Sequence, residues 1–429
     1  MERKRPQPNS LFMGNVRKSA VGVMSNMNTM TYKMLRYIAW CMIVGFILTA
    51  CLPQNTSTAT RLAITPTSGS TNALSGISND EGQKDWSGEL YLLLSTASPP
   101  FAYRCVRLPI DCLLNATCQS VDILQDLPTN YTPFAPLSWA PDGQRALIFN
   151  SNESQLLVFD PQKGAFHPLI DKIAMTTGRI VWSPDGQWVA VAVQDTEPYR
   201  SHVVLVDPDN GTQRALESFE SQEQLPLGWL NERELLVLVE KYRPIREGDF
   251  LKQEVSEAKI YKVNVWNNQW VELGQNKNWI GNTLPVLSPD KSELAFTTND
   301  RKHLLVIMRL EGMKENILGA YGVQPVWSPD GKEIALYRRI REDQIEVSVV
   351  HSDGTSPRIV FRGEGALANT VWLPDSKRLL ILTISIVQET TSLFVVDVTG
   401  GNPRPLSVPG LDAEAYQISW LSVRPPMKP

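Results

Sequence analysis

The sequence predicts an all-β protein, a β-propeller of four-stranded antiparallel blades. Three observations predict this fold: a tryptophan-containing turn motif recurs along the chain, its copies are spaced like propeller blades, and apolar runs of strand length follow each copy. The clearest copy is Trp182-Ser183-Pro184-Asp185-Gly186. We call the first residue of each copy its anchor, and the anchors are Trp139, Trp182, Trp229, Leu287, Trp327, Trp372 and Trp420.

The spacing of the anchors matches one blade for each copy. Successive anchors lie 43, 47, 58, 40, 45 and 48 residues apart, and propeller blades repeat at about 40 to 50 residues. Seven anchors favour seven blades. Six blades are the alternative, if the segment around Trp86 and the end of the chain at Trp420 do not share a blade.

The residues of the motif suit a tight turn between two strands. Pro184 fixes φ for the second position of a type I turn, Asp185 can accept hydrogen bonds from backbone amides, and Gly186 can adopt the left-handed conformation. The anchor therefore ends one strand, and the next strand begins after the turn. We interpret the anchor indole as packing between blades, where burial of such a side chain contributes about 1.5–3 kcal/mol.

Each repeat predicts four antiparallel strands. After the turn come two apolar runs, such as residues 188–193 and 203–206, and then a short fourth strand, such as residues 358–360. A sheet with two apolar faces can bury both only when blades pack around an axis, and a closed ring leaves short, protected edges. The chain ends on an isolated strand at residues 418–420, so we expect it to complete the first blade and close a propeller that spans residues 86–422, with 423–429 as a tail.

The turn motif resembles that of TolB-like β-propellers, and also that of the propellers of dipeptidyl-peptidase-like enzymes. The resemblance covers about Leu137 to Trp420 and is strong for the fold but weak for function. TolB-like proteins bind envelope proteins through the propeller, so the resemblance implies a protein partner in the cell envelope. The sequence departs from TolB in carrying a lipidation signal and in showing no counterpart of the α/β domain that precedes that propeller.

The first fifty residues read as an export signal. A basic flank at Lys33 and Arg36 precedes an apolar stretch over residues 37–49 that is short for a membrane span. It ends at Leu48-Thr49-Ala50-Cys51, which resembles the lipobox of bacterial lipoproteins, so residues 1–50 are predicted to be removed and Cys51 to be lipidated. The alternatives are a chance cysteine near a plain signal, or a short membrane anchor.

The mature chain is predicted to be acidic and tethered outside the cytoplasm. Residues 1–50 hold seven of the 41 basic residues and one of the 45 acidic residues, so cleavage leaves 34 and 44, a formal net charge of −10. That charge disfavours a nucleic-acid partner. Residues 51–85 are rich in Ser and Thr, and we expect a flexible tether that holds a monomeric propeller to a bacterial membrane.

Three cysteines lie close together in this exported domain. Oxidation is permitted there, and we favour a disulfide between Cys112 and Cys118 with Cys105 free, although three cysteines allow three pairings. A metal site is the rival interpretation. It is disfavoured because no histidine lies nearby and the spacing is not that of paired C-x-x-C motifs.

No catalytic motif is present in the sequence. It has no G-x-S-x-G elbow, no H-E-x-x-H and no phosphate-binding loop, and its four histidines lie in or beside predicted strands. We therefore expect no catalytic residue, no metal ion and no cofactor. The recurring Asp of the motif is interpreted as a turn former, not an acid catalyst.

The candidate partner-binding segment is the insertion of residues 240–257, which explains the longest spacing. Arg and aromatic residues on protruding loops often anchor interfaces, and smaller sets lie at residues 198–200 and 338–341.

The predicted function is a protein-binding or scaffolding module in the bacterial cell envelope; the alternative is a hydrolase or lyase acting on peptides or glycans in the central funnel. Clustered carboxylates with raised pKa at the ring's centre would favour the enzyme, and an apolar funnel the binder. The candidate binding residues are Lys241, Tyr242, Arg243, Arg246 and Phe250.

Overall fold

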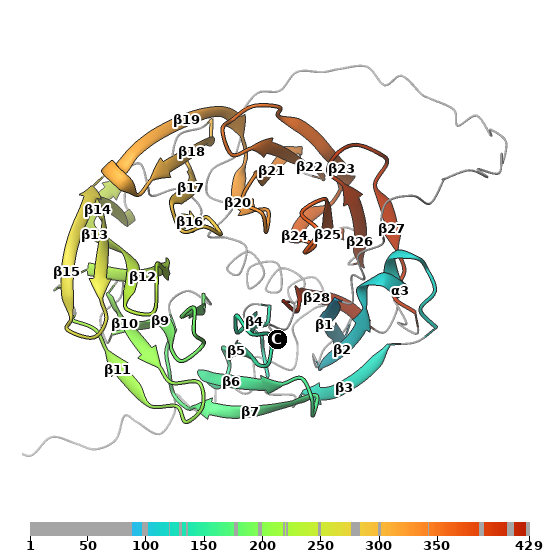
Figure 1. Cartoon of the computed structure of the whole chain (residues 1–429), viewed down its shortest axis with the longest axis horizontal. Helices are drawn as coiled ribbons and strands as arrows, with labels where there is room; N and C mark the ends of the chain where they lie inside the picture. The colour runs from blue at the N-terminus through green and yellow to red at the C-terminus, as the bar shows by residue number, and fades with distance from the viewer. Residues whose placement is uncertain are drawn as a thin grey trace, which may run out of the picture. The chain divides into compact units, whose positions relative to one another are not determined.

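Each repeat forms one four-stranded blade, as the apolar runs predict. The structure is a computed structural model that describes residues 88–96, 102–119, 121–127, 131–133, 136–175, 179–195, 200–217, 219, 222–247, 250–275, 284–298, 302–341, 343–385, 390–409 and 416–425. Over these residues the strands form seven four-stranded antiparallel sheets around one axis (Figure 1). The fold is thus an all-β propeller of seven blades. The predicted signal, residues 1–50, and tether, 51–85, lie outside the described residues.

We number the blades in chain order and give their strands from the axis outward. Blade 1 consists of β28 (Tyr416–Val423), β1 (Glu89–Thr96), β2 (Tyr103–Pro109) and β3 (Asp122–Leu127); blade 2 of β4 (Ser138–Trp139), β5 (Ala146–Asn150), β6 (Gln155–Asp160) and β7 (Ala165–Ile170); blade 3 of β8 (Val181–Trp182), β9 (Val189–Gln194), β10 (Ser201–Val206) and β11 (Gln213–Ala215); and blade 4 of β12 (Gln222–Trp229), β13 (Glu234–Glu247), β14 (Phe250–Asn264) and β15 (Gln269–Gln275).

The remaining three blades follow the same plan. Blade 5 consists of β16 (Val286–Leu287), β17 (Glu293–Thr297), β18 (Leu304–Arg309) and β19 (Lys314–Tyr321); blade 6 of β20 (Val323–Trp327), β21 (Glu333–Arg341), β22 (Gln344–His351) and β23 (Arg358–Glu364); and blade 7 of β24 (Ala366–Trp372), β25 (Arg378–Ser385), β26 (Thr390–Asp397) and β27 (Arg404–Leu406). A short helix, α3 (Ile110–Leu114), follows β2, and a 3-10 turn, η2 (Glu311–Met313), precedes β19.

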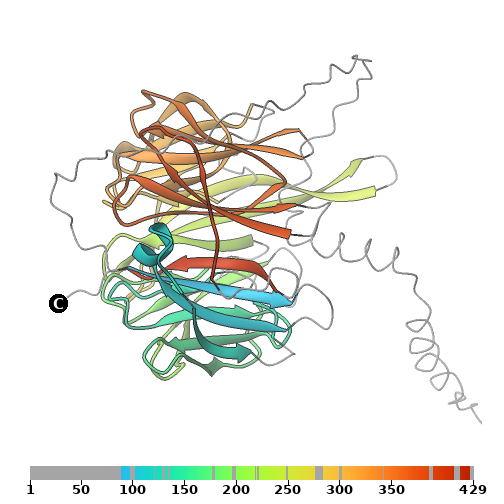
Figure 2. The same cartoon turned by 90° about the vertical axis from the view of Figure 1, so that its right-hand side faces the viewer.

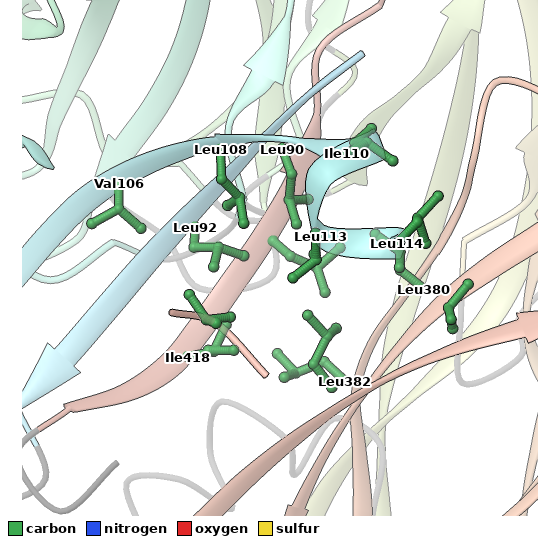
Figure 3. Packing of buried hydrophobic residues seen from close by; sticks show 14 of the residues in the cluster. Leu90, Leu92, Val106, Leu108, Ile110, Leu113, Leu114, Leu380, Leu382 and Ile418 are labelled. Atoms are coloured by element: carbon green, nitrogen blue, oxygen red, sulfur yellow. The ribbon is translucent and has the colours of Figure 1, made fainter. Parts of the chain in front are cut away.

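The two ends of the described chain share blade 1. β28 pairs antiparallel with β1, from Val423 opposite Leu90 to Tyr416 opposite Thr96. Apolar side chains of blades 7 and 1 pack together at this junction, and Ile110 of α3 joins the same cluster (Figure 3). The predicted closure by the terminal strands is confirmed, and it removes the free edge that β1 would otherwise present.

The anchor tryptophans link each blade to the blade before it. The indole N–H of Trp182 donates to the carbonyl oxygen of Ser138 at 3.0 Å, and Ser138 directly precedes the anchor of blade 2. Three further indoles follow the same rule. They are Trp229 bonded to the carbonyl of Val181 (3.0 Å), Trp327 to that of Val286 (3.1 Å) and Trp372 to that of Val326 (3.0 Å).

Blade 5 has a leucine as its anchor and makes this contact differently. The side chain of Leu287 lies directly against the backbone of Gly228, which precedes the anchor of blade 4. A Cβ at residue 228 would lie 2.7 Å from Cδ2 of Leu287, closer than side chains can approach. Gly228 therefore permits an apolar contact where the other blades form a hydrogen bond.

The anchor of blade 1 is not Trp420, as the sequence predicted, but Val423. The indole N–H of Trp139 donates to Oγ of Ser422 at 2.9 Å, and that hydroxyl donates to the carbonyl of Leu137 at 2.9 Å. Ser422 thus occupies the place of the residue before an anchor. Trp420 lies three residues earlier on β28. The prediction was wrong because the spacing between copies does not reveal a shift of three residues where the turn motif is missing.

The motif turns are closed by side-chain hydrogen bonds. Oγ of Ser183 donates to Oδ1 of Asp185 at 2.5 Å and accepts the backbone N–H of Trp188 at 2.9 Å. Gly186 is left-handed, with φ +71°. Where the motif has lost its glycine, Lys291 and Ser376 have φ of +66° and +57°, so the turn geometry is retained at the expense of some backbone strain.

We expect Ser422→Ala to lower the free energy of unfolding by about 1–3 kcal/mol, because it removes both hydrogen bonds that join blades 1 and 2 through this hydroxyl. Urea unfolding followed by tryptophan fluorescence measures the change. Ser292→Ala removes a hydrogen bond in an exposed turn and is the control, with an expected change below about 0.5 kcal/mol. Equal destabilisation by the two substitutions would contradict the proposed role of Ser422.

Candidate functional site

The insertion at residues 240–257 folds as the outer part of a long β-hairpin. β13 and β14 have 14 and 15 residues, and the other described strands have at most nine. Their pairing continues to Glu247 opposite Phe250, with a bulge between Lys241 and Tyr242. Figure 2 shows that this hairpin projects beyond the neighbouring blades. We call the part beyond residue 241 on β13 and before residue 259 on β14 the projecting hairpin.

The projecting hairpin has two free strand edges in the described part of the chain. On one side, the pairing of β12 with β13 ends at Gln222 opposite Lys241. On the other, the pairing of β15 with β14 reaches only Gln275 opposite Lys259. Free edges present backbone N–H and C=O groups that can pair with a strand from another chain.

The predicted binding residues differ in their exposure. Lys241, Arg243 and Arg246 are exposed, and the Arg243 side chain, 63% exposed, donates from Nη2 to Oε2 of Glu254 at 2.8 Å. Tyr242 is half-buried. The side chain of Phe250 lies outside the described residues. The smaller Arg-rich set at residues 338–341 belongs to β21 of blade 6, so the structure does not place it on the hairpin's own blade.

A pair of carboxyl groups, one buried and one half-buried, lies at the base of the projecting hairpin. Glu223 of β12 is directly opposite Glu240 of β13, and the hydroxyl of Tyr242 donates to Oε2 of Glu240 at 2.8 Å. Glu240 is 5% exposed. Burial raises its pKa to about 7, the negative charge of Glu223 adds to this, and the hydrogen bond from Tyr242 opposes it.

Burial also raises the pKa values of the two neighbouring groups, Glu223 and Tyr242. Burial raises the pKa of Glu223 against the opposing bond from Tyr242. Burial, and then the two carboxylates, raises the pKa of Tyr242. No sequence motif marks this cluster. Its one available signal was a glutamate continuing an apolar strand, Leu235 to Val239, at a position that the strand alternation predicts to be buried.

A cavity of about 210 Å³ opens on the axis of the ring. We call it the axial cavity. Its walls come from the innermost strands β20, β24 and β28, from β21 and β22 behind them, and from the segment before β4. The lining residues are Pro136, Gln324, Val326, Ala335, Leu336, Tyr337, Val347, Leu367, Ala368, Asn369, Thr370 and Trp420. The described lining contains no carboxylate.

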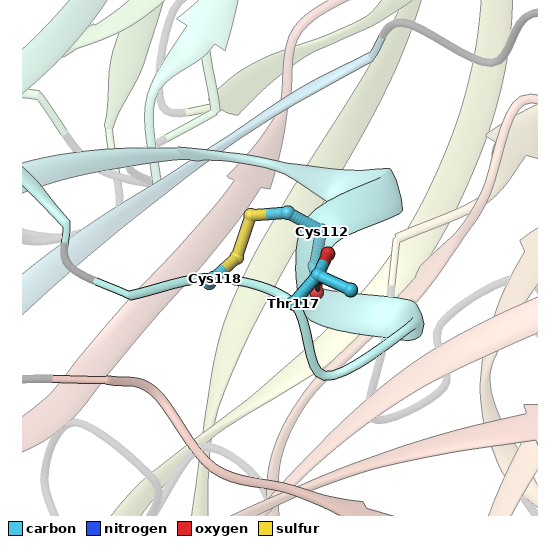
Figure 4. The surroundings of a disulfide bond; sticks show 3 residues. All are labelled: Cys112, Thr117 and Cys118. Carbon is cyan, nitrogen blue, oxygen red and sulfur yellow. Dashed lines mark hydrogen bonds between the residues drawn. A yellow bond between two sulfur atoms is a disulfide. The ribbon is translucent and has the colours of Figure 1, made fainter.

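The cysteines of blade 1 take no part in either region. A disulfide joins Cys112 of α3 to Cys118, and the intervening turn is held by the backbone N–H of Thr117 donating to the carbonyl of Cys112 at 2.8 Å (Figure 4). Cys105 is a buried free thiol. Burial raises its pKa to about 12, so its reactive thiolate form is suppressed at neutral pH.

The described residues form neither a metal site nor a membrane-spanning helix. Among them no group of three or more His, Cys, Asp or Glu side chains is arranged to hold a metal ion. Within the same ranges, no helix has the length and apolar character needed to cross a membrane.

Comparisons with known proteins identify the fold but no family. No protein-family model and no curated protein matches the sequence. Among solved structures, oligogalacturonate lyase from Vibrio parahaemolyticus is 12% identical, with a TM-score of 0.52 over 76% of this chain and 89% of that one. A putative 6-phosphogluconolactonase from Bacteroides fragilis is 13% identical, with a TM-score of 0.52 over 80% and 99%.

TolB propellers are also among the structural neighbours. TolB from Acinetobacter baumannii is 16% identical, with a TM-score of 0.43 over 64% of this chain. The chain spans 63% of the length of that TolB. At these identities the likeness to all three proteins concerns the fold alone.

We expect Glu240 to make the protein less stable as the pH rises. Its pKa is about 7 in the folded state and ordinarily 4.5, so the folded state holds the proton more tightly. This contribution is fully present below pH 4.5 and is lost between pH 4.5 and 7, amounting to roughly 3 kcal/mol. Unfolding free energies of the wild type and Glu240→Gln, measured across this range, should diverge in favour of the variant as the pH rises.

Glu254→Gln is the matched control for this titration, because Glu254 lies on the same hairpin but 46% of its side chain is exposed. The pH dependence that Glu240→Gln shows beyond that of Glu254→Gln is assigned to the burial of Glu240. The same pH dependence in both variants would contradict the raised pKa of Glu240.

Proposed function

We propose that this protein is a lipid-anchored, extracytoplasmic β-propeller that binds a protein partner in the bacterial cell envelope. The observation that carries the binding role is the projecting hairpin, which extends β13 and β14 past the ring and has two free edges among the described strands. A partner segment in extended conformation adds to such an edge through backbone hydrogen bonds.

Side chains on the projecting hairpin supply specificity. Arg243 and Arg246 are exposed, and Arg is enriched among the residues that dominate binding energy at interfaces. The hairpin base is rigid, because β13 is paired on both sides up to Lys241 and its inward residues are buried. A rigid base reduces the conformational entropy that binding would otherwise remove.

The axial cavity supports binding over catalysis. A hydrolase or lyase in the central funnel, the alternative function, needs an acid and a base facing the substrate. Tyr337 is the ionisable group among the described lining residues, and Glu223 and Glu240 do not belong to that lining. The carboxyl pair with raised pKa values therefore lies away from the cavity in which such chemistry would take place.

The membrane attachment in this proposal rests on the Leu48-Thr49-Ala50-Cys51 motif. Two or more acyl chains on one residue hold a protein to a membrane stably, whereas one chain gives marginal binding. The export signal and the resemblance to TolB-like propellers together support the cell envelope as the location of the partner.

We expect the double substitution Arg243→Ala and Arg246→Ala to reduce partner capture by at least about 10-fold, the effect of losing about 1.4 kcal/mol of binding energy. Immobilised wild type and variant are incubated with solubilised envelope membranes, and captured proteins are quantified by mass spectrometry. Arg309→Ala is the control, because Arg309 is 73% exposed on blade 5. Identical recoveries for all three proteins would reject the hairpin as the binding surface.

Metabolic labelling with palmitate tests the anchor. We expect label on the wild type and none on Cys51→Ser, with the variant moving from the membrane fraction to the soluble fraction. Wild-type protein that takes up no label would overturn lipidation while leaving the hairpin test intact.

A further inference from the structure

The axial cavity lies where three neighbouring innermost strands depart from regular pairing. These strands are β20, β24 and β28 of the consecutive blades 6, 7 and 1 (Figure 1). β20 has two residues, Gln324 and Pro325, where β21 has one, and β24 and β28 each have one extra residue, Ala368 and Ser419. Bulges bend a strand and redirect its side chains, and they are common beside active sites. Gln324, Ala368 and Trp420, which lie in or next to the three bulges, line this one cavity.

The described lining of the axial cavity carries no charged side chain. None of its residues is an Asp, Glu, Lys, Arg or His. Burial raises the pKa of the Tyr337 hydroxyl, so this ionisable group of the described lining is neutral at physiological pH. A charged ligand that entered the cavity would lose its hydration without gaining a partner of opposite charge, which is unfavourable. The lining therefore favours an uncharged ligand.

The size and the apolar wall of the cavity suit a single aromatic ring. Ala335 and Leu336 of β21 and Val347 of β22 form the wall behind the innermost strands, and all three are buried. The half-buried indole of Trp420 adds an aromatic surface against which another ring can pack. The volume of the cavity is about 210 Å³, and an apolar cavity of roughly 150 Å³ holds benzene. There is thus room for one six-membered ring with a small substituent.

Two amide side chains of the lining have hydrogen-bonding groups available for a ligand. Nδ2 of Asn369 donates to the carbonyl of Leu421 at 3.3 Å, which leaves Oδ1 as an acceptor. The side-chain amide of Gln324 forms no hydrogen bond with the described residues. Gln324 also has φ +56°, and backbone strain of this kind is concentrated at functional sites. An apolar wall with a few polar groups is the usual composition of a small-molecule site.

The hydroxyl of Thr370 belongs to the same lining. Its Oγ1 is buried without a hydrogen-bond partner among the described residues. Most buried polar groups of folded proteins have a partner, so an unsatisfied one calls for an explanation. Its position beside the cavity agrees with a site that is completed by a polar group of a ligand.

We propose that the axial cavity binds a small, uncharged aromatic molecule that carries one hydrogen-bonding substituent. The ring packs against Trp420 and the apolar wall, and the amides of Asn369 and Gln324 bond to the substituent. A charged substituent of the same shape is rejected, because the described lining offers no opposite charge. This site is separate from the projecting hairpin, which belongs to blade 4, so it stands or falls independently of the protein partner.

Benzamide and benzoate form a matched pair of probes. They have the same ring and nearly the same shape, but only benzoate is charged at neutral pH. Binding of each probe to the full-length protein is measured by ligand-observed NMR titration. We expect benzamide to bind at least about 10-fold more tightly than benzoate, because transfer of a carboxylate into an uncharged cavity is unfavourable.

Two substitutions test where the probe binds. Ala368→Leu fills part of the cavity and should weaken benzamide binding at least about 10-fold. Asn369→Leu replaces the amide with an apolar group of similar size, and it should weaken benzamide by about 2- to 10-fold while toluene, which has no polar substituent, keeps its affinity. Ala215→Leu is the control, because Ala215 is exposed on β11 of blade 3; it should leave benzamide binding unchanged.

Thermal unfolding identifies the variants that fold. The proposal is overturned if the wild type binds neither probe, if it binds benzoate as tightly as benzamide, or if folded Ala368→Leu binds benzamide as the wild type does. Should Ala368→Leu fail to fold, Asn369→Leu decides the position of the site. An unchanged preference of Asn369→Leu for benzamide over toluene then overturns the proposal.

Discussion

The architecture depends on one repeated contact, the hydrogen bond from an anchor indole to a backbone carbonyl of the preceding blade. Burial of apolar side chains drives the blades together, but it is non-directional. Two apolar sheet faces packed only in this way could shift relative to each other. A bond of about 3.0 Å between Trp372 and the carbonyl of Val326 is directional. Among the described residues this bond recurs for Trp182, Trp229 and Trp327, and Ser422 relays an equivalent contact between Trp139 of blade 2 and blade 1.

The anchors determine the position of the blades relative to one another. Residues at other positions of the blades can therefore differ in type from blade to blade. Three positions before the anchor the side chain is a proline in blade 2, an arginine in blade 3 and a tryptophan in blade 1. Blade 4 is likewise extended by the projecting hairpin without disturbing its neighbours, since the extension leaves at the end of the strands away from the anchor turn. The fold thus separates the residues that hold the ring together from those that face the axis or the solvent.

Two regions of the propeller carry opposite electrostatic features. At the base of the hairpin, Glu240 is buried opposite the half-buried Glu223, and burial favours the neutral forms of both. Arg179, before β8 of blade 3, keeps its charge and donates to the carbonyl oxygen of Pro285. Water hydrates charged groups strongly, and protein interiors replace that hydration only with specific partners. At the hairpin base burial therefore favours the protonated carboxyl group, and at Arg179 a backbone carbonyl replaces part of the lost hydration.

The sequence alone determined the repeat and the four strands of each blade, because turn chemistry and apolar periodicity are local properties. It favoured seven blades closed by the terminal strands over six, and the structure confirms seven. The sequence also located the insertion in blade 4. Only the tertiary structure decided that Val423 and not Trp420 is the anchor of blade 1, that Glu223 lies opposite Glu240, and that Gln324 and Asn369 line one cavity. These facts depend on register between strands far apart in the chain, and a shift of a few residues leaves the spacing pattern almost unchanged while altering every contact.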